Sequence, residues 1–414
     1  MQLIPFIQIY RLIYNILKIL AVFVRPFLPL KLKKWIELRN SQEYLNCKLK
    51  NSIWFHASSG EIEYCKSVIR EIKKKHPNQP IIVSYSSPSA VKLIQSLKND
   101  VECFFPLPWD TLKLSQNLMD HLKPRALIFS RTDLWPELIT QAKLYHIPLM
   151  VISMYSKLNF LNRFTLSWLL TQFTLISTVN KKFSEELKNL SDQDVLFHSD
   201  TRFDQAFFRL QQASRIPTFI KNKKIVFAST WPEDDTVILP VIDDLIKKNL
   251  FDQIIICPHE THRSPFYKNY FQNSKPLLLS QELFNPSIKN SKLLIIDQVG
   301  YLADIYRQTE FAFVGGSFRK KIHSVLEPLL ANNIIFFGPQ FQNNPEAVET
   351  ELQRLTFCLK TSTEMIQFIE NIKTEEKLEL KIKINKYNQS QLGSTAYIVQ
   401  EIMKKLDTDQ KDKI

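Results

Sequence analysis

Glycine is scarce in this chain: six glycines occur in 414 residues, whereas soluble proteins average about 7%. The glycine-rich turn G-x-G-x-x-G is absent, which argues against a nicotinamide-dependent oxidoreductase. The glycines that remain are expected where the backbone tolerates no Cβ atom. Two such turns follow predicted strands in opposite halves of the chain, which predicts a site assembled from two domains. The glycines at predicted strand ends are Gly60, Gly315, Gly316 and Gly338.

Cysteine is sparse as well. The five cysteines are odd in number and show no paired spacing, so the sequence predicts neither a disulfide framework nor a zinc site. A reducing compartment is the expected environment. The cysteines are Cys47, Cys65, Cys103, Cys257 and Cys358.

The length and the charge narrow the class of protein. A chain of 414 residues exceeds the size at which one hydrophobic core stops growing, so we expect two domains. The chain carries 54 basic and 41 acidic residues, a net charge of +13. This excess favours an anionic partner, such as a nucleic acid, a phosphorylated small molecule or an acidic membrane face. Charge alone does not choose among the three.

The N-terminal 40 residues read as a membrane-associated amphipathic helix and a basic linker. Arg11, Lys18 and Arg25 interrupt an apolar stretch at seven-residue intervals and share one narrow helical face, and Pro26 ends the pattern. A basic segment, residues 31–34, follows. The pattern predicts a helix on the membrane surface or a tilted anchor. It fits a cleaved signal peptide poorly. The alternative is an ordinary core-packing helix.

Beyond residue 50, short apolar runs alternate with amphipathic helical patterns, which predicts an α/β fold with parallel sheets. The domain boundary is expected between Asp204 and Lys221, and a disordered tail after Leu406. The predicted strands of the first domain are Ser52–Ala57, Ile81–Ser84 and Ala126–Phe129. Those of the second are Ile225–Ala228, Gln253–Cys257, Leu293–Ile296, Phe311–Val314 and Ile334–Phe337.

Glu61 follows the first predicted strand and lies in the first turn of the next helix. One interpretation is a capping box with Ser58, a common structural device. The other is a general base, because open α/β sheets place ligands at the carboxyl ends of their strands. The sequence alone favours the capping box.

A second turn, Gly315-Gly316-Ser317, follows the predicted strand Phe311–Val314 and precedes three basic residues, 319–321. Backbone amides beside cations suit a phosphate. Glu327 could accept hydrogen bonds from ribose hydroxyls, although Ser324 and Glu327 also have capping-box spacing. His323, taken alone, would more often be structural.

Two further strand ends could face a ligand. Ser229 and Thr230 precede a predicted helix that begins with a proline and several acids. These residues are common at helix starts, so they need no functional explanation. His259 and His262 are three residues apart, but no third metal ligand is evident. We therefore expect no metal site.

Taken in order, these motifs resemble the bacterial 3-deoxy-D-manno-octulosonic acid (Kdo) transferases, which begin the sugar core of lipopolysaccharide. The likeness extends along nearly the whole chain, and six motifs in sequence are more specific than any one. An N-terminal membrane helix is also part of the family pattern. The motifs are residues 54–61, 133–136, 200–204, 229–234, 258–260, and 313–317 continuing through His323 to Glu327-Pro328.

The resemblance implies a GT-B architecture, in which two Rossmann-like domains face each other across a cleft. Residues 41–204 would form the acceptor-binding domain and residues 205–380 the nucleotide-sugar domain. A C-terminal crossing helix would occupy residues 381–406, with Leu392 to Met403 as its core, and a charged tail residues 407–414.

The resemblance also implies the reaction: an inverting transfer of Kdo from CMP-Kdo to a lipid A precursor, lipid IVA, without a metal or cofactor. Glu61 would deprotonate the acceptor hydroxyl. The implied partners are CMP-Kdo, the lipid and an anionic membrane surface at the cytoplasmic face of the cell inner membrane, with no nucleic acid. The implied acceptor-side residues are Ser59, Gly60, Arg131 and Asp133. The implied donor-side residues are Ser229, Thr230, Pro258, His259, Gly315, Gly316, Ser317, His323, Ser324 and Glu327.

The chain departs from the family pattern in several places. It has Arg131-Thr132-Asp133 where many relatives have Glu-Thr-Glu, and Ser324 where relatives usually have asparagine. Lys321-Ile322 stand where a glycine usually precedes the histidine, and the Glu61 motif is one residue short. Two alternatives therefore stay open: an inactive paralogue that acts as a lipid-binding or scaffold protein, and another GT-B nucleotide-sugar enzyme.

Overall fold

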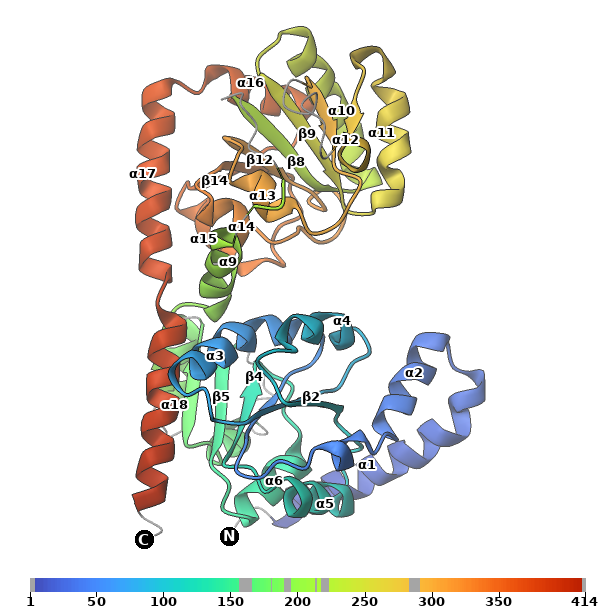
Figure 1. Ribbon diagram of the computed structural model, residues 1–414, viewed down its shortest axis with the longest axis vertical. Helices are drawn as coiled ribbons and strands as arrows, with labels where there is room; N and C mark the ends of the chain where they lie inside the picture. The colour runs from blue at the N-terminus through green and yellow to red at the C-terminus, as the bar shows by residue number, and fades with distance from the viewer. Residues whose placement is uncertain are drawn as a thin grey trace. The chain divides into compact units, whose positions relative to one another are not determined.

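A computed structural model of the chain describes residues 4–155, 166–179, 181–189, 195–212, 214–216, 223–282 and 291–411. The chain forms two compact units, each built on a seven-stranded sheet (Figure 1). Unit 1 comprises residues 1–205 and 391–414, and unit 2 comprises residues 206–390. The C-terminal end of the chain therefore returns to unit 1.

The sheet of unit 1 is parallel throughout, in the order β3-β2-β1-β4-β5-β6-β7. The strand order reverses between β1 and β4, and such a switch point is where open parallel sheets bind ligands. The strands are β1 (Ile53–His56), β2 (Ile81–Tyr85), β3 (Cys103–Pro106), β4 (Ala126–Ser130), β5 (Leu149–Met154), β6 (Leu175–Thr178) and β7 (Val195–Phe197).

Helices cover both faces of this sheet, so its strands are near-continuous apolar runs. Alternate residues of β1 enter two cores: Trp54 packs with the helices α5 and α6, and Phe55 packs with α3 and α18, which lie side by side in Figure 1. The helices are α3 (Ile62–Lys75), α4 (Ala90–Ile94), α5 (Leu112–Leu122), α6 (Pro136–Leu144), α8 (Lys181–Lys188) and α9 (Thr201–Gln211), with 3₁₀ turns η2 (Glu43–Asn46), η3 (Ser59–Glu61) and η4 (Gln95–Leu97).

Unit 2 repeats the pattern, with a parallel sheet in the order β10-β11-β9-β8-β12-β13-β14 and a switch point between β8 and β12. Its strands are β8 (Lys224–Thr230), β9 (Gln253–Pro258), β10 (Leu277–Leu278), β11 (Leu293–Ile295), β12 (Phe311–Val314), β13 (Ile334–Phe337) and β14 (Thr356–Cys358). Its helices are α10 (Pro232–Lys247), α11 (Ser264–Tyr270), α12 (Leu279–Glu282), α13 (Leu302–Tyr306), α14 (Leu326–Leu330), α15 (Pro345–Leu352), α16 (Ser362–Asn371) and α17 (Thr374–Gln391), with 3₁₀ turns η5 (Thr261–Arg263) and η6 (Gln272–Ser274).

The N-terminal segment forms α1 (Ile4–Val24), a 3₁₀ turn η1 (Arg25–Phe27) and α2 (Leu30–Arg39). The polar face of α1 contacts unit 1, where Arg11 forms a bidentate ion pair with the buried carboxylate of Glu137 at 2.7 and 2.9 Å. The apolar face is exposed, with Leu12 at 64% and Phe23 at 75%. The core-packing alternative for this helix is therefore wrong.

The C-terminal segment differs from expectation. Two helices occupy it, α17 and α18 (Ser394–Lys411), separated at Gly393, whose φ of +97° favours glycine. Because α18 continues to Lys411, the prediction of a disordered tail after Leu406 is wrong for residues 407–411. The side chain of Leu406 lies in the core beside α3, which explains why the helix does not stop there.

The cysteine prediction also needs correction. Cys47 and Cys103 form a disulfide between η2 and β3, with their Cα atoms 5.7 Å apart. They are 56 residues apart in the chain, so only the tertiary pairing of these elements brings them together. The argument from cysteine usage for a reducing compartment therefore loses its support. The free cysteines are Cys65, Cys257 and Cys358.

Candidate active site

Glu61 lies at the carboxyl end of β1, beside the switch point of the unit 1 sheet. The turn η3 carries it there, and the Ser130 hydroxyl at the end of β4 donates to the Glu61 carbonyl at 2.9 Å. The capping box predicted from the sequence is present at this turn, and in it the Ser58 backbone N–H lies 3.4 Å from a Glu61 carboxylate oxygen. This contact is long, and it engages one of the two oxygens of a half-buried carboxylate. Capping therefore does not exclude a second role for Glu61.

Asp133 follows β4, the neighbouring strand, and is held in a hydrogen-bond network. Its Oδ2 lies 2.6 Å from the Ser86 hydroxyl and 2.9 Å from His56 Nε2. His56 Nδ1 lies 2.8 Å from the Ser84 hydroxyl, which itself accepts from the indole of Trp54 at 2.7 Å. The indole Nε1–H of Trp135 also lies 3.0 Å from His56 Nε2, so this ring nitrogen contacts both an N–H donor and the Asp133 carboxylate.

The two carboxylates have pKa values on opposite sides of their usual range. Burial, followed by the negative charge of Asp133, raises the pKa of Glu61 to about 7. Burial acts to raise the pKa of Asp133 too, but the hydrogen bond and charge of His56 and the Ser86 hydroxyl lower it to about 2. A general base works best with a pKa near the working pH. Two neighbouring carboxylates whose pKa values are shifted in opposite directions often have separate acid–base roles. Of the two, Glu61 is the better general base.

Replacing Asp133 by Asn should move the pH dependence of the reaction. Glu61 acts as a base only when ionised, so the rate falls below its pKa, and we expect the acidic limb of kcat/KM at about pH 7. Asp133→Asn removes a negative charge that raises this pKa, so the limb should move down by roughly one pH unit. The control Asp120→Asn removes an acid on α5 that bonds Tyr145 at the surface and should leave the limb in place. An unmoved limb in Asp133→Asn would mean that another group titrates.

The remaining acceptor-side residues lie around the same strand ends. The Ser59 hydroxyl lies 2.7 Å from that of Ser89, and Arg131 is half-buried immediately after β4. Gly60 lies in the turn but does not need to be glycine, because a Cβ atom there would meet nothing within 4 Å. The prediction that Gly60 tolerates no side chain is wrong.

Backbone strain gathers at this edge of the sheet. Ser59, Arg131 and Ser153 have φ values of +41°, +67° and +54°, at the carboxyl ends of β1, β4 and β5. These strands are neighbours. A non-glycine residue in this conformation costs on the order of 1 kcal/mol, and such residues cluster at functional sites. The strain supports a site here independently of Glu61.

In unit 2, the carboxyl ends of β9, β8 and β12 bring Pro258–His259, Ser229–Thr230 and Gly315–Ser317 to one edge of the sheet. The structure corrects the prediction that the glycine amides await a phosphate. The Gly315 amide bonds the Ala228 carbonyl, and the Gly316 amide donates to Asp234 Oδ2 at 2.8 Å. Asp234 is fully buried and also accepts from the amide of Phe318 at 3.1 Å. An internal carboxylate therefore occupies the place expected for a phosphate.

The two glycines serve close packing of the chain. A Cβ atom on Gly315 would lie 2.3 Å from the Ser229 carbonyl oxygen, and one on Gly316 would lie 2.4 Å from the Lys321 carbonyl oxygen. Gly316 also has a φ of +79°. Both positions therefore exclude larger residues, as the sequence predicts, but for a structural reason.

Several predicted donor-side residues have internal partners. Ser317 is buried and bonds the Val314 carbonyl and the Gly338 amide. Thr230 is buried against the Tyr267 hydroxyl at 2.8 Å. These two side chains are not open to a ligand in this structure, which corrects their assignment.

Two other predicted donor-side residues form local contacts at the start of α14. Ser324 accepts from the Leu326 amide at 3.3 Å. The N-cap of α14 is Val325, which makes no side-chain cap, so the Ser324–Glu327 capping box that was the alternative to function is not formed. Glu327 pairs with Arg209 at 3.1 Å. Both side chains remain exposed or half-buried, so neither is excluded from contact with a ligand.

His259 and His323 form a flat platform with Trp231. The indole Nε1–H of Trp231 donates to His323 Nε2 at 2.8 Å, and the two rings are nearly coplanar at 2°. The ring of His259 stacks on both, with centroids 4.5 and 4.3 Å away. Burial, then the charges of His259 and the neighbouring cations, lowers the pKa of His323 to about 4. The platform is therefore neutral at pH 7.

Sequence reasoning named Arg319 and Asp133 but missed their partners. Arg319 is exposed and lies 4.0 Å above the indole of Trp231, and Asp234 had been explained as a helix-start acid. His56 ends β1 and Asp133 follows β4, so their proximity could have been inferred from strand order. No local signal reveals that Asp234 reaches the glycine turn, because that contact spans 82 residues.

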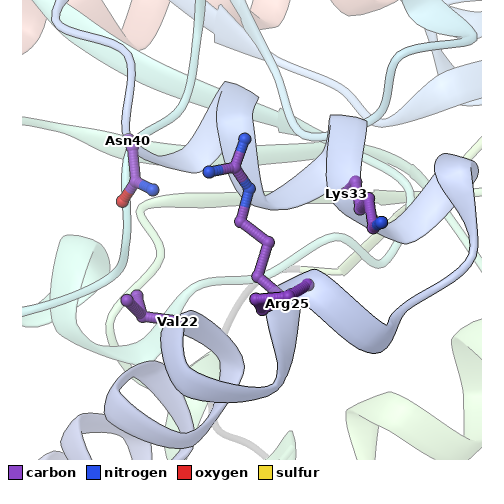
Figure 2. A pocket seen from close by; sticks show the side chains of 5 residues that line it. Val22, Arg25, Lys33 and Asn40 are labelled. Carbon is purple, nitrogen blue, oxygen red and sulfur yellow. The ribbon is translucent and has the colours of Figure 1, made fainter.

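Within the described ranges, no group of three or more His, Cys, Asp or Glu side chains could hold a metal ion. A pocket of about 320 Å³ lies between α1 and α2, lined by Val22, Arg25, Pro26, Lys33 and Asn40. Figure 2 shows the Arg25 side chain extending between Asn40 and Lys33. The lining of this pocket includes no residue from the strand ends of either sheet. We therefore assign the transfer chemistry to the strand ends and not to this pocket.

Comparison with known proteins agrees with the geometry. Residues 33–205 match the family described as 3-Deoxy-D-manno-octulosonic-acid transferase (kdotransferase). A 3-deoxy-D-manno-octulosonic acid transferase of Rickettsia prowazekii is 25% identical over 73% of this chain and 67% of the relative. The enzyme of the same name from Rickettsia typhi is 23% identical over 85% of this chain and 79% of the relative. The chain is similar to Kdo transferases over these spans. The resemblance inferred from its motifs is confirmed.

Solved structures bear on the fold. The UDP-GlcNAc 2-epimerase of Neisseria meningitidis has a TM-score of 0.58 at 15% identity, over 86% of this chain and all of that one. MurG of Acinetobacter baumannii has a TM-score of 0.54 at 11% identity, over 85% of this chain and 99% of that one. With the two parallel sheets, these neighbours confirm the predicted GT-B fold class.

Proposed function

We propose that the chain is a glycosyltransferase that moves Kdo from CMP-Kdo to a lipid A precursor, with inversion at the anomeric carbon and without a metal. The acceptor hydroxyl oxygen forms a bond to the anomeric carbon of Kdo. The bond from that carbon to the phosphate oxygen breaks, and CMP leaves with the electron pair. The hydroxyl proton passes to Glu61. One observation carries the proposal: a half-buried carboxylate of near-neutral pKa at the switch point of the sheet of a Kdo transferase relative.

Unit 2 is proposed to hold the donor through the platform and the cations beside it. The neutral His323 and Trp231 surfaces can stack a base or sugar without repelling it, and Arg319, Lys320 and Lys321 are exposed next to them. Fixed positive charge stabilises a departing phosphate, which is work that other transferases assign to a metal. Ser229, whose φ is +54°, and Pro258 and Glu327 complete the proposed donor-side set.

Release of CMP tests the proposal. Incubation with CMP-Kdo and a lipid A precursor should release CMP in proportion to the acceptor added, and no CMP without acceptor. Binding of the lipid with no CMP release would instead favour a lipid-binding paralogue. Protection of the protein against heat by a different nucleotide sugar, but not by CMP-Kdo, would favour another donor.

We also propose that α1 and α2 attach the chain to the anionic cytoplasmic face of the inner membrane. The segment 6–27 is long and apolar enough to cross a membrane, and 6% of its most apolar window is buried. Phe27 and Leu30 are 86% and 68% exposed, and the lysines of α2 lie among the apolar residues. Apolar exposure with adjacent cations suits an acidic lipid surface.

A charge on the apolar face of α1 should weaken membrane attachment. Phe23→Asp removes a 75% exposed ring and adds a carboxylate that anionic lipid repels, so we expect sedimentation with phosphatidylglycerol vesicles to fall at least roughly tenfold. Leu378→Asp changes an exposed apolar residue on α17 and serves as the matched control. Equal vesicle binding by both variants would contradict the membrane role of this face.

A further inference from the structure

Arg131 has no side-chain hydrogen-bond acceptor among the residues that the structure describes. In the described part of unit 1, it alone among the arginines has neither an ion pair nor a side-chain hydrogen bond. Arg39 donates to the carbonyls of Leu107 and Pro108. The others are paired with acids: Arg11 with Glu137, Arg25 with Glu37, Arg70 with Asp100, Arg125 with Asp407 and Arg202 with Asp200.

The position of this guanidinium is nevertheless defined. Its central carbon lies 4.6 Å from the ring centroid of Tyr64 and 5.6 Å from that of Tyr155. Arg202 contacts the same Tyr64 ring at 4.4 Å, but its charge is offset by Asp200. The backbone of Arg131 is held at a φ of +67°, a conformation that costs free energy for a side-chain-bearing residue. Stacking and strain therefore fix a half-buried cation whose donors are unused.

A guanidinium presents donors in a planar fork that fits a phosphate or carboxylate with two parallel hydrogen bonds. Arg131 lies close enough to Glu61 for its charge to lower the pKa of that carboxylate. An anion that binds Arg131 therefore lies beside the proposed base, where the acceptor must place its reacting hydroxyl.

We propose that Arg131 selects acceptors that carry an anionic group next to the hydroxyl that Glu61 deprotonates. This inference rests on the proposed function and names a feature of its acceptor. The anion is a phosphate of the lipid or the carboxylate of a Kdo residue already attached, since both present two oxygens to the fork. When it binds, its charge offsets that of Arg131, so Glu61 becomes more basic as the acceptor arrives.

The test compares Arg131→Gln with wild type on three acceptors: a phosphorylated lipid A precursor, the same lipid after phosphatase treatment, and the lipid carrying one Kdo. We expect KM to rise about 10- to 100-fold, with little change in kcat, only for acceptors that carry the recognised anion. An effect that disappears with phosphatase treatment identifies the phosphate. An effect confined to the Kdo-bearing lipid identifies the carboxylate. An equal rise in KM for all three overturns the proposal.

Two further measurements separate recognition from folding. Arg131→Lys keeps the charge without the fork and should recover part of the KM loss, whereas Arg70→Gln, which breaks a surface ion pair on α3, should change nothing. The acidic limb of the pH profile should move up in Arg131→Gln, because a positive charge that lowers the pKa of Glu61 is gone. Equilibrium binding of the phosphorylated lipid in detergent micelles is independent of transfer. If binding weakens in Arg131→Gln but no variant releases CMP, the proposed function fails, whereas the anion contact of Arg131 is retained.

Discussion

Glu61→Gln lowers kcat for transfer by about 10²–10⁴-fold, the usual contribution of a positioned general base. Glutamine keeps the size of the side chain and can still accept the Ser58 amide, so the turn η3 should remain intact. Because the amide cannot take a proton, only the chemical step is lost. Steady-state CMP release measures the effect, and KM for CMP-Kdo should change little.

The matched control is Glu63→Gln, two residues along, where the carboxylate pairs with Lys66 at 2.5 Å on α3. It should retain wild-type kcat. The residual rate of Glu61→Gln should also lose the acidic limb near pH 7, because the titrating group is gone. Wild-type kcat in Glu61→Gln would remove the base assignment. Asp133 would not take over this role, because a carboxylate with a pKa of about 2 is a weak base.

Asp234→Ala should unfold unit 2 more readily than any surface change in that unit. The carboxylate accepts backbone N–H groups from Trp231, Gly316 and Phe318. A stranded buried donor costs about 1–3 kcal/mol, so losing this acceptor should lower the free energy of unfolding by roughly 3–5 kcal/mol. Urea unfolding followed by tryptophan fluorescence measures the loss.

Asp243→Ala, on the same helix, removes a surface carboxylate that bonds the Tyr270 hydroxyl at 3.1 Å and should cost less than about 1 kcal/mol. Donor binding should fall with Asp234→Ala even under conditions where unit 2 stays folded, because the turn carries Arg319 and His323 to the platform. If Asp234→Ala were as stable as the control, the turn would not depend on this carboxylate.

The sequence predicts the sheets well and the contacts between distant turns poorly. The strands Phe311–Val314 and Ile334–Phe337 are confirmed to the residue, because buried parallel strands are short apolar runs bounded by turn residues. The strand β5 (Leu149–Met154) escaped prediction although it is as apolar and as buried. Periodicity alone does not separate such a run from a buried helical segment.

In the candidate site, too, the positions of residues at strand ends are predictable from the sequence, whereas the contacts between distant turns are not. That Glu61, Arg131 and Asp133 share one edge follows from parallel strands ending at the same side of a sheet. That Asp234 fills the glycine turn, or that Cys47 meets Cys103, depends on side-chain contacts across 82 and 56 residues, which no local pattern encodes. The pKa of Glu61 depends on burial and on Asp133 together, so it too appears only in the folded chain.

The most direct test of Glu61 as the base of a Kdo transfer is the mass of the lipid formed from one defined acceptor, in the presence of EDTA, with wild type and Glu61→Gln side by side. The account predicts that wild type adds the mass of at least one Kdo residue, whereas Glu61→Gln leaves the acceptor unchanged over the same time. A wild-type product without Kdo, or equal conversion by Glu61→Gln, would contradict it.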